Sequence, residues 1–185
     1  MRRNTILIIM LAGGMLTQMP VAMRAQPPQP AEPEYAGAVY YLDSTGRLVP
    51  LESQPGNARM KTKAMGFGGG TMLVTFKEAR SPVRLKSDPQ LELVVRLEAG
   101  SLDPALVVNL NVLLSNKNNR EAAIAKAGPM GFGAKTTQGD SSIKLTFVKY
   151  GDHSVKFTAA EKLPSGEYVV STKATGKQGF LFGVD

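Results

Sequence analysis

Hydrophobic and polar side chains alternate along much of this chain. In the clearest runs, which begin at Leu91, Val108 and Ile143, apolar residues occupy every second position. A period of two places successive side chains on opposite faces of a β-strand, so these runs predict half-buried strands. The shorter candidate strands are 37–42, 47–51, 58–64, 71–76, 83–86, 155–157, 167–172 and 179–184.

Turn-forming residues separate these candidate strands. Gly, Pro, Asn, Asp and Ser gather in the segments 43–46, 55–57, 87–89, 139–140, 150–152 and 164–166, where their backbone preferences favour chain reversal. About ten short strands at this spacing favour a β-sandwich or a barrel. We predict an all-β fold, an antiparallel β-sandwich of immunoglobulin-like character with at most one short helix.

One segment, 120–127, fits two kinds of element. Its alanines favour a helix, but Ala122 and Ile124 also occupy alternate positions, as in a strand. Because an isolated helix of this length is marginal in water, we favour the strand.

The N-terminal residues predict export. Arg2 and Arg3 precede an apolar run at 6–11, and small residues stand at Ala22 and Ala25, a pattern typical of a secretory signal peptide. The apolar stretch is interrupted well short of the roughly 20 residues that a stable span requires. We therefore expect a signal peptide at 1–25, with no stable transmembrane anchor after cleavage and a periplasmic, cell-surface or secreted location.

A proline-rich segment follows the predicted signal peptide. Four prolines fall within residues 26–34, which is incompatible with a helix or a sheet and predicts an extended spacer. We place this spacer at 26–35 and a single β-sandwich domain at 36–185.

Composition narrows the possible functions. The 185 residues include no cysteine and no tryptophan, and His153 is the single histidine, which argues against thiol catalysis and leaves little acid–base chemistry near neutral pH. Removal of residues 1–25 takes away three arginines and no acid, so the net charge falls from +7 to +4. A charge of this size is ordinary for solubility. We expect no nucleic-acid partner, no cofactor, no metal site and no catalytic residue.

A short repeat supplies the first candidate contact surface. The sequence Met-Gly-Phe-Gly occurs at 65–68 and again at 130–133, and neither copy has the spacing of a nucleotide-binding loop. Two glycine-flexed loops could present apolar side chains to a partner; alternatively, each Phe folds inward and caps the core. The candidate partner contacts are Met65, Phe67, Met130 and Phe132.

A second candidate surface is cationic. Arg59, Lys61 and Lys63 occupy alternate positions, which places them on one face of a strand, where they could contact an anionic surface glycan. A solvated strand face, or an edge protected by lysines against aggregation, is the alternative interpretation.

Two weaker hypotheses concern catalysis and copper. Asp152, His153 and Ser154 are consecutive, and they are the only motivation for a hydrolase. The scattered methionines, among them Met60 and Met72, could bind cuprous copper, although core packing is the default role of methionine.

The motif Pro-x-Gly-x-Tyr at 164–168 precedes an alternating strand. It is similar to the entry into the penultimate strand of many immunoglobulin-like and transthyretin-like domains, where the tyrosine hydroxyl fixes a corner. Tyr168 would take that role. With the terminal Phe-Gly-Val-Asp, the chain over about residues 36–185 resembles a group of uncharacterised exported bacterial β-sandwich proteins.

The resemblance implies an exported β-rich domain but no activity, so no functional residue is carried over. Our leading hypothesis is an exported cell-envelope binding or structural module without catalytic activity, with an envelope protein as the expected partner. A carbohydrate- or polyanion-binding module is the second hypothesis, and a hydrolase ranks below both.

Overall fold

The computed structural model describes residues 30–62, 70–88, 91–98, 103–127, 137–138 and 141–185. The expected signal peptide at 1–25 lies outside these ranges. Within them, no helix has both the length and the apolar character needed to cross a membrane.

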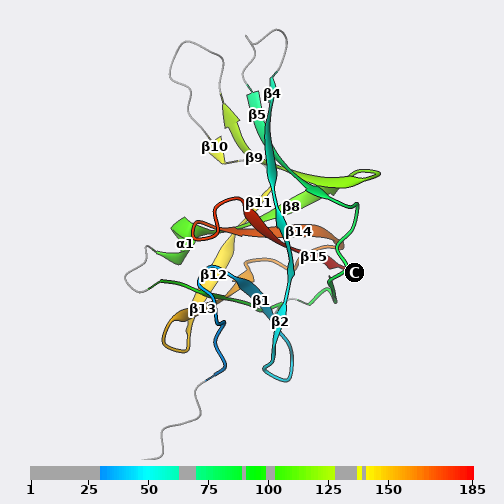
Figure 1. Cartoon of the computed structure of the whole chain (residues 1–185). Coiled ribbons are helices and arrows are strands. Elements are labelled where there is room, and N and C mark those ends of the chain that lie inside the picture. Colours follow the sequence, from blue (N-terminus) through cyan, green and yellow to red (C-terminus); the bar gives the residue numbers. More distant parts are fainter. Residues whose placement is uncertain (1–29, 63–69, 89–90, 99–102, 128–136, 139–140) are drawn as a thin grey trace, which may run out of the picture.

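Two sheets pack against each other (Figure 1). The first sheet contains, in spatial order, β12 (Leu145–Tyr150), β13 (Ser154–Ala159), β7 (Leu93–Arg96), β1 (Val39–Leu42) and β2 (Leu48–Pro50). The second, here called the curled sheet, contains β3 (Glu52–Pro55), β15 (Gln178–Val184), β14 (Gly166–Thr172), β8 (Val108–Ser115), β9 (Asn119–Ala127), β5 (Gly70–Lys77) and β4 (Asn57–Thr62).

Three short strands extend the curled sheet. They are β6 (Arg84–Leu85) beside β15, β10 (Thr137–Gln138) beside β9 and β11 (Ser142–Ile143) beside β8. The β6–β15 pairing is parallel, and the other strand pairings in the described ranges are antiparallel. The prediction of an all-β sandwich is therefore confirmed.

The ambiguous segment at 120–127 is part of strand β9, as expected. The short helix is instead α1 (Pro104–Val107), where the alternating pattern predicted none. Asp103 caps this helix, because its carboxylate accepts a hydrogen bond of 2.9 Å from the Ala105 amide.

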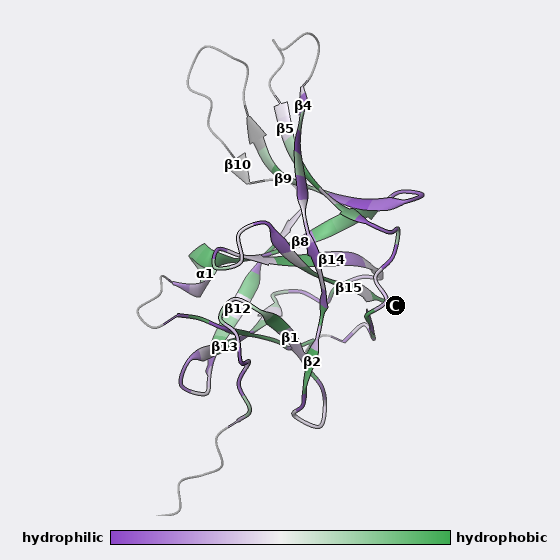
Figure 2. Ribbon diagram, viewed as in Figure 1, coloured by the Kyte–Doolittle hydropathy of each residue, from purple (hydrophilic) through white to green (hydrophobic). Residues whose placement is uncertain are grey.

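Strands β8, β14 and β15 form a middle layer that is buried on both faces. Val170 and Phe182 belong to the core shared with the first sheet, whereas Val169 and Leu181 belong to a second cluster on the opposite face. Burial on both sides explains why residues 179–184 are almost uniformly apolar rather than alternating. The turn between β8 and β9, which lies outside this layer, is hydrophilic (Figure 2).

The second sheet curls because one stretch of chain supplies both of its ends. Strands β3 and β4 lie at opposite ends of the strand order, yet Gly56 alone separates them in the chain. In Figure 1 the segment from β2 to β4 runs as one long extended path. The side chain of Gln54 on β3 accepts a hydrogen bond of 3.1 Å from the Lys77 amide at the end of β5, which helps to close the curl.

The concave side of the curled sheet, here called the inner face, contains the second cluster. The cluster joins β14 and β15 to β5, β8 and β9, and its buried members are Phe76, Leu113, Ala122, Val169 and Leu181. The protein thus has two cores, one on each side of the middle layer.

The alternation of hydrophobic and polar residues predicts the wrong face for one residue of the first sheet. The pattern assigned Val94 to the polar face of its strand, but Val94 is fully buried. Its cross-strand neighbours are Tyr40 and Lys156, and Lys156 forms an ion pair of 2.6 Å with Glu92. The longer side chains flanking Val94 shield it from water.

Tyr168 makes the contact that the corner motif requires. Its hydroxyl donates a hydrogen bond of 2.6 Å to the carbonyl oxygen of Pro164, and its ring stacks on Phe182 with 5.4 Å between centroids. Burial raises the pKa of the Tyr168 hydroxyl, so the group remains a neutral donor at physiological pH.

We expect the inner face to be intolerant of added volume at Gly179. A Cβ there would lie 2.6 Å from the Phe76 ring, so Gly179→Val should lower the free energy of unfolding by about 1–3 kcal/mol. In the matched control Gly166→Ala, the new Cβ would have its nearest neighbour at 3.6 Å, and the change should stay within about 0.5 kcal/mol. Urea denaturation measures both; equal effects would contradict this account of the inner face.

Candidate functional site

The inner face runs from a charged, closed end to an apolar, open end. Residues directly opposite each other in antiparallel strands share a face. Phe76 stands opposite Arg120, and Val74 opposite Ala122. The inner face can therefore be followed from Arg120, through the second cluster, towards the outer ends of β4 and β5.

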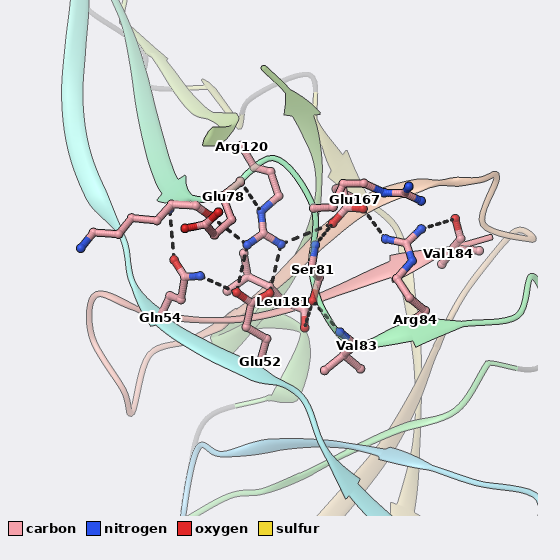
Figure 3. A network of polar contacts seen from close by, with 12 residues as sticks. Glu52, Gln54, Glu78, Ser81, Val83, Arg84, Arg120, Glu167, Leu181 and Val184 are labelled. Atoms are coloured by element: carbon pink, nitrogen blue, oxygen red, sulfur yellow. Dashed lines mark hydrogen bonds and ion pairs between the residues drawn. The ribbon is translucent and has the colours of Figure 1, made fainter. Parts of the chain in front are cut away.

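Arg120 occupies the closed end and is completely buried (Figure 3). Its guanidinium binds Glu52 in a bidentate manner at 3.0 and 3.1 Å and contacts Glu167 at 3.3 Å. It also donates to the carbonyl oxygens of Lys77, at 3.0 Å, and Glu78, at 3.1 Å. All five N–H donors of the side chain therefore have an acceptor.

A second arginine extends this charged network. Arg84 forms ion pairs with Glu167 and Asp185, and the other oxygen of Glu167 accepts a hydrogen bond of 2.8 Å from the Ser81 amide. Gly183 lies between Arg84 and Glu167 in the sheet, and a Cβ there would overlap the Arg84 guanidinium. Because Gly183 has no side chain, the Arg84 guanidinium can cross the strand at this position and reach Glu167.

The charges in this network alternate in sign, because each arginine lies between two carboxylates. Burial raises the pKa of Glu52, but hydrogen bonds from Arg120 and neighbouring polar groups outweigh it, so the net pKa lies below its usual value of 4.5. Sequence reasoning missed this network entirely. Its acceptors come from β3, β14 and the end of β5, strands that are distant in sequence from Arg120.

The open end of the inner face contains a cavity of about 200 Å³. Its walls are formed by β4, β5 and β9 on one side and by β8, β14 and the start of β15 on the other. The lining residues are Gly56, Ala58, Val74, Phe76, Asn111, Ala122, Ile124, Val169, Ser171, Gly176, Lys177, Gln178 and Gly179.

Asn111 is the polar side chain most deeply placed in this lining. Only 5% of the residue is exposed, and its side-chain amide has no hydrogen-bond partner among the residues that the structure describes. The amide is therefore available to a group that enters the cavity.

Two exposed methionines continue the apolar surface beyond the cavity. Met60 on β4 and Met72 on β5 are directly opposite each other, and they are 52% and 37% exposed. Neither methionine is buried in a core, where methionine side chains usually lie. No group of His, Cys, Asp and Glu suited to a metal ion occurs in the described ranges.

The cationic candidates lie on the other, outer face of β4. Arg59 forms an ion pair of 2.6 Å with Glu121. This pair crosses β5 between Leu73 and Thr75 and helps to bury Leu73. Arg59 is therefore already neutralised, whereas Lys61 is exposed on the same face and Lys63 lies outside the described residues.

The four repeat residues, Met65, Phe67, Met130 and Phe132, also lie outside the described residues. The strands that border the two repeats are described, and they end together. Gly70, which follows the first repeat, pairs with Ala127, which precedes the second. The two repeats are thus connected to neighbouring positions of the curled sheet.

Asp152, His153 and Ser154, which suggested a hydrolase, bind a carboxylate of the N-terminal segment. The Glu32 carboxylate accepts hydrogen bonds from the Ser154 hydroxyl at 2.5 Å and from the amides of Asp152 and His153 at 2.7 and 3.0 Å. The Ser154 hydroxyl is therefore directed at a carboxylate rather than at the His153 ring. Burial raises the pKa of Glu32, but these hydrogen bonds outweigh it and lower the net pKa.

Part of the proline-rich segment is consequently attached to the domain. In addition to the Glu32 contacts, Arg96 donates a hydrogen bond of 3.2 Å to the carbonyl oxygen of Pro33, which is itself buried. Within the predicted spacer at 26–35, Glu32 and Pro33 are thus in contact with the domain, Glu32 at the β12–β13 turn.

No protein family, curated protein or solved structure matches this chain.

We expect Arg120 to be essential for stability. Arg120→Met removes the cation and leaves two carboxylates buried without it, which should lower the free energy of unfolding by about 3–5 kcal/mol. The control Arg59→Met removes an arginine whose side chain is 60% exposed, and should cost less than about 1 kcal/mol. Chemical denaturation that gave similar losses for the two variants would contradict the assignment.

The network also predicts acid sensitivity. Because the pKa of Glu52 is lower in the folded protein than its usual 4.5, its stabilisation is present above that pH and is lost as the pH falls through the folded-state pKa. Glu52→Gln should therefore show a shallower loss of unfolding free energy below pH 4.5 than the wild type. The exposed Glu98→Gln should retain the wild-type profile; parallel profiles for wild type and Glu52→Gln would refute the coupling.

Proposed function

We propose that this chain is a non-catalytic binding module of the cell envelope, which holds an apolar group of a partner on the inner face of its curled sheet. The observation that carries the proposal is the continuity of that face. Apolar side chains extend without a break from the buried second cluster, through the cavity, to the exposed pair Met60 and Met72.

An exposed apolar surface of this kind needs a physical reason. Soluble proteins seldom leave large contiguous apolar patches in water, and those that exist are commonly contact sites. Methionine is well suited to such a site, because its flexible side chain adapts to differently shaped partners. The two Met-Gly-Phe-Gly repeats connect to the same end of the sheet, which is consistent with one contact region.

The side chains that line the cavity favour binding of a ligand over catalysis. Its polar lining side chains are those of Asn111, Ser171, Lys177 and Gln178. These supply hydrogen bonds and one exposed cation, but none of the described lining residues has a carboxylate, imidazole or thiol to act as a general base. Placement in the envelope rests on the signal-like pattern of residues 1–25.

The proposal can be tested with a photoreactive side chain on either face of one strand. A benzoylphenylalanine at position 60 would lie on the inner face of β4, and one at position 61 on the outer face. Both positions are exposed. In cells that export the full chain, we expect cross-linking to a discrete partner several-fold stronger from position 60 than from position 61.

Thermal denaturation of the two labelled proteins controls for folding. Cross-linking of equal strength from both faces, or from position 61 alone, would show that the inner face is not the contact surface. Absence of any discrete adduct from position 60 in folded protein would reject the binding-module proposal.

A further inference from the structure

The two walls of the cavity differ in chemistry. One wall carries the apolar side chains Val74, Phe76 and Ile124, from β5 and β9. The opposite wall carries Asn111 on β8 and Ser171 on β14, together with the apolar Val169. A molecule in this space therefore contacts mainly apolar side chains and can form hydrogen bonds at one wall.

The volume limits the size of that molecule. An apolar cavity of roughly 150 Å³ is known to accept benzene, and the cavity here measures about 200 Å³. The space thus accommodates one six-membered ring with a small substituent. A larger ring system would extend out of the open end of the cavity.

The unpartnered amide of Asn111 indicates what the substituent is. Only 5% of Asn111 is exposed, and its side chain borders the cavity without a hydrogen bond to another described residue. A hydroxyl can both donate to the amide oxygen and accept from the amide nitrogen. Among the described lining residues, the exposed Lys177 is the only charged one, so the part of the ligand that these residues contact is neutral.

We propose that the cavity binds a phenol ring, with the ring against Phe76 and its neighbours and the hydroxyl at Asn111. This inference rests on the proposed function, because it names the group held by the same inner face. A phenol can come from a free small molecule or from a tyrosine side chain of the partner. Both sources present the same chemistry to the cavity.

The test compares two ligands that differ in one hydroxyl. The full chain is titrated with p-cresol and with toluene, and binding is followed by changes in amide NMR signals. In the wild type, both ligands should perturb the strands that line the cavity. In Asn111→Leu, which keeps a similar side-chain shape, the preference for p-cresol relative to toluene should fall about three- to tenfold.

The same variant separates a binding role from a structural one. If Asn111 serves a ligand, Asn111→Leu should retain the melting temperature, because the substitution breaks no side-chain hydrogen bond to another described residue. A clear loss of stability would show that the amide has a structural role and would overturn the inference. An unchanged p-cresol-to-toluene preference, or no binding of p-cresol to the wild type, would also overturn it.

A pair of filling variants locates the binding. Ala58→Phe places a ring at the cavity wall and should abolish p-cresol binding, whereas Asn57→Phe places the ring on the outer face of the same strand and should not. Equal affinity in the two variants would place the ligand elsewhere and reject the site.

A competition experiment distinguishes the two possible sources of the phenol. A capped Gly-Tyr-Gly peptide that competes with p-cresol supports a partner tyrosine, whereas p-cresol binding without peptide competition supports a free phenol. If cross-linking from position 60 succeeds while p-cresol fails to bind, the phenol inference is rejected and the binding-module proposal stands.

Discussion

Burial of strands β8, β14 and β15 on both faces is the constraint on which this structure depends. One face of this middle layer is covered by the five-stranded sheet. The other carries Val169 and Leu181, which a simple two-layer sandwich would leave in water. The protein covers them by extending the same sheet through β9, β5 and β4 and curling it over its own surface. The segment from β2 to β4 supplies β2 at one edge of the five-stranded sheet, and β3 and β4 at the two ends of the strand order of the curled sheet.

The two ends of the inner face differ in whether their polar side chains have hydrogen-bond partners within the protein. At the closed end, Arg120 has an acceptor for each of its donors, so buried charge is compensated. At the open end, Gly56 and Gly179 allow the Phe76 ring to pack closely against the backbone, and Asn111 faces the cavity that remains beside it. A rigid, satisfied network thus lies beside a site that is neither filled nor satisfied, an arrangement suited to holding a ligand in a fixed position.

The candidate site was only partly accessible to sequence reasoning. Alternation identified β4, β5 and β9, and it separated Met60 from its neighbours Arg59 and Lys61 on opposite faces. It could not show that Arg59 is neutralised by Glu121, because that contact joins strands 62 positions apart in the chain. One signal for the charged network was present. Arg120 and Glu167 occupy the same alternate positions as the apolar residues Ala122 and Val169, where an unpaired charge would be costly.

The sequence by itself determined that the chain forms short antiparallel strands, where most of them lie and that Tyr168 makes a corner, because period-two patterning and turn chemistry act over a few residues. It did not determine that residues 179–184 are covered on both sides, that Glu32 docks beside Ser154, or that Asn111 lacks a partner. These features depend on which distant strands meet and in which register. Only the tertiary structure decides them, since a polar side chain becomes satisfied, neutralised or available according to what the fold places opposite it.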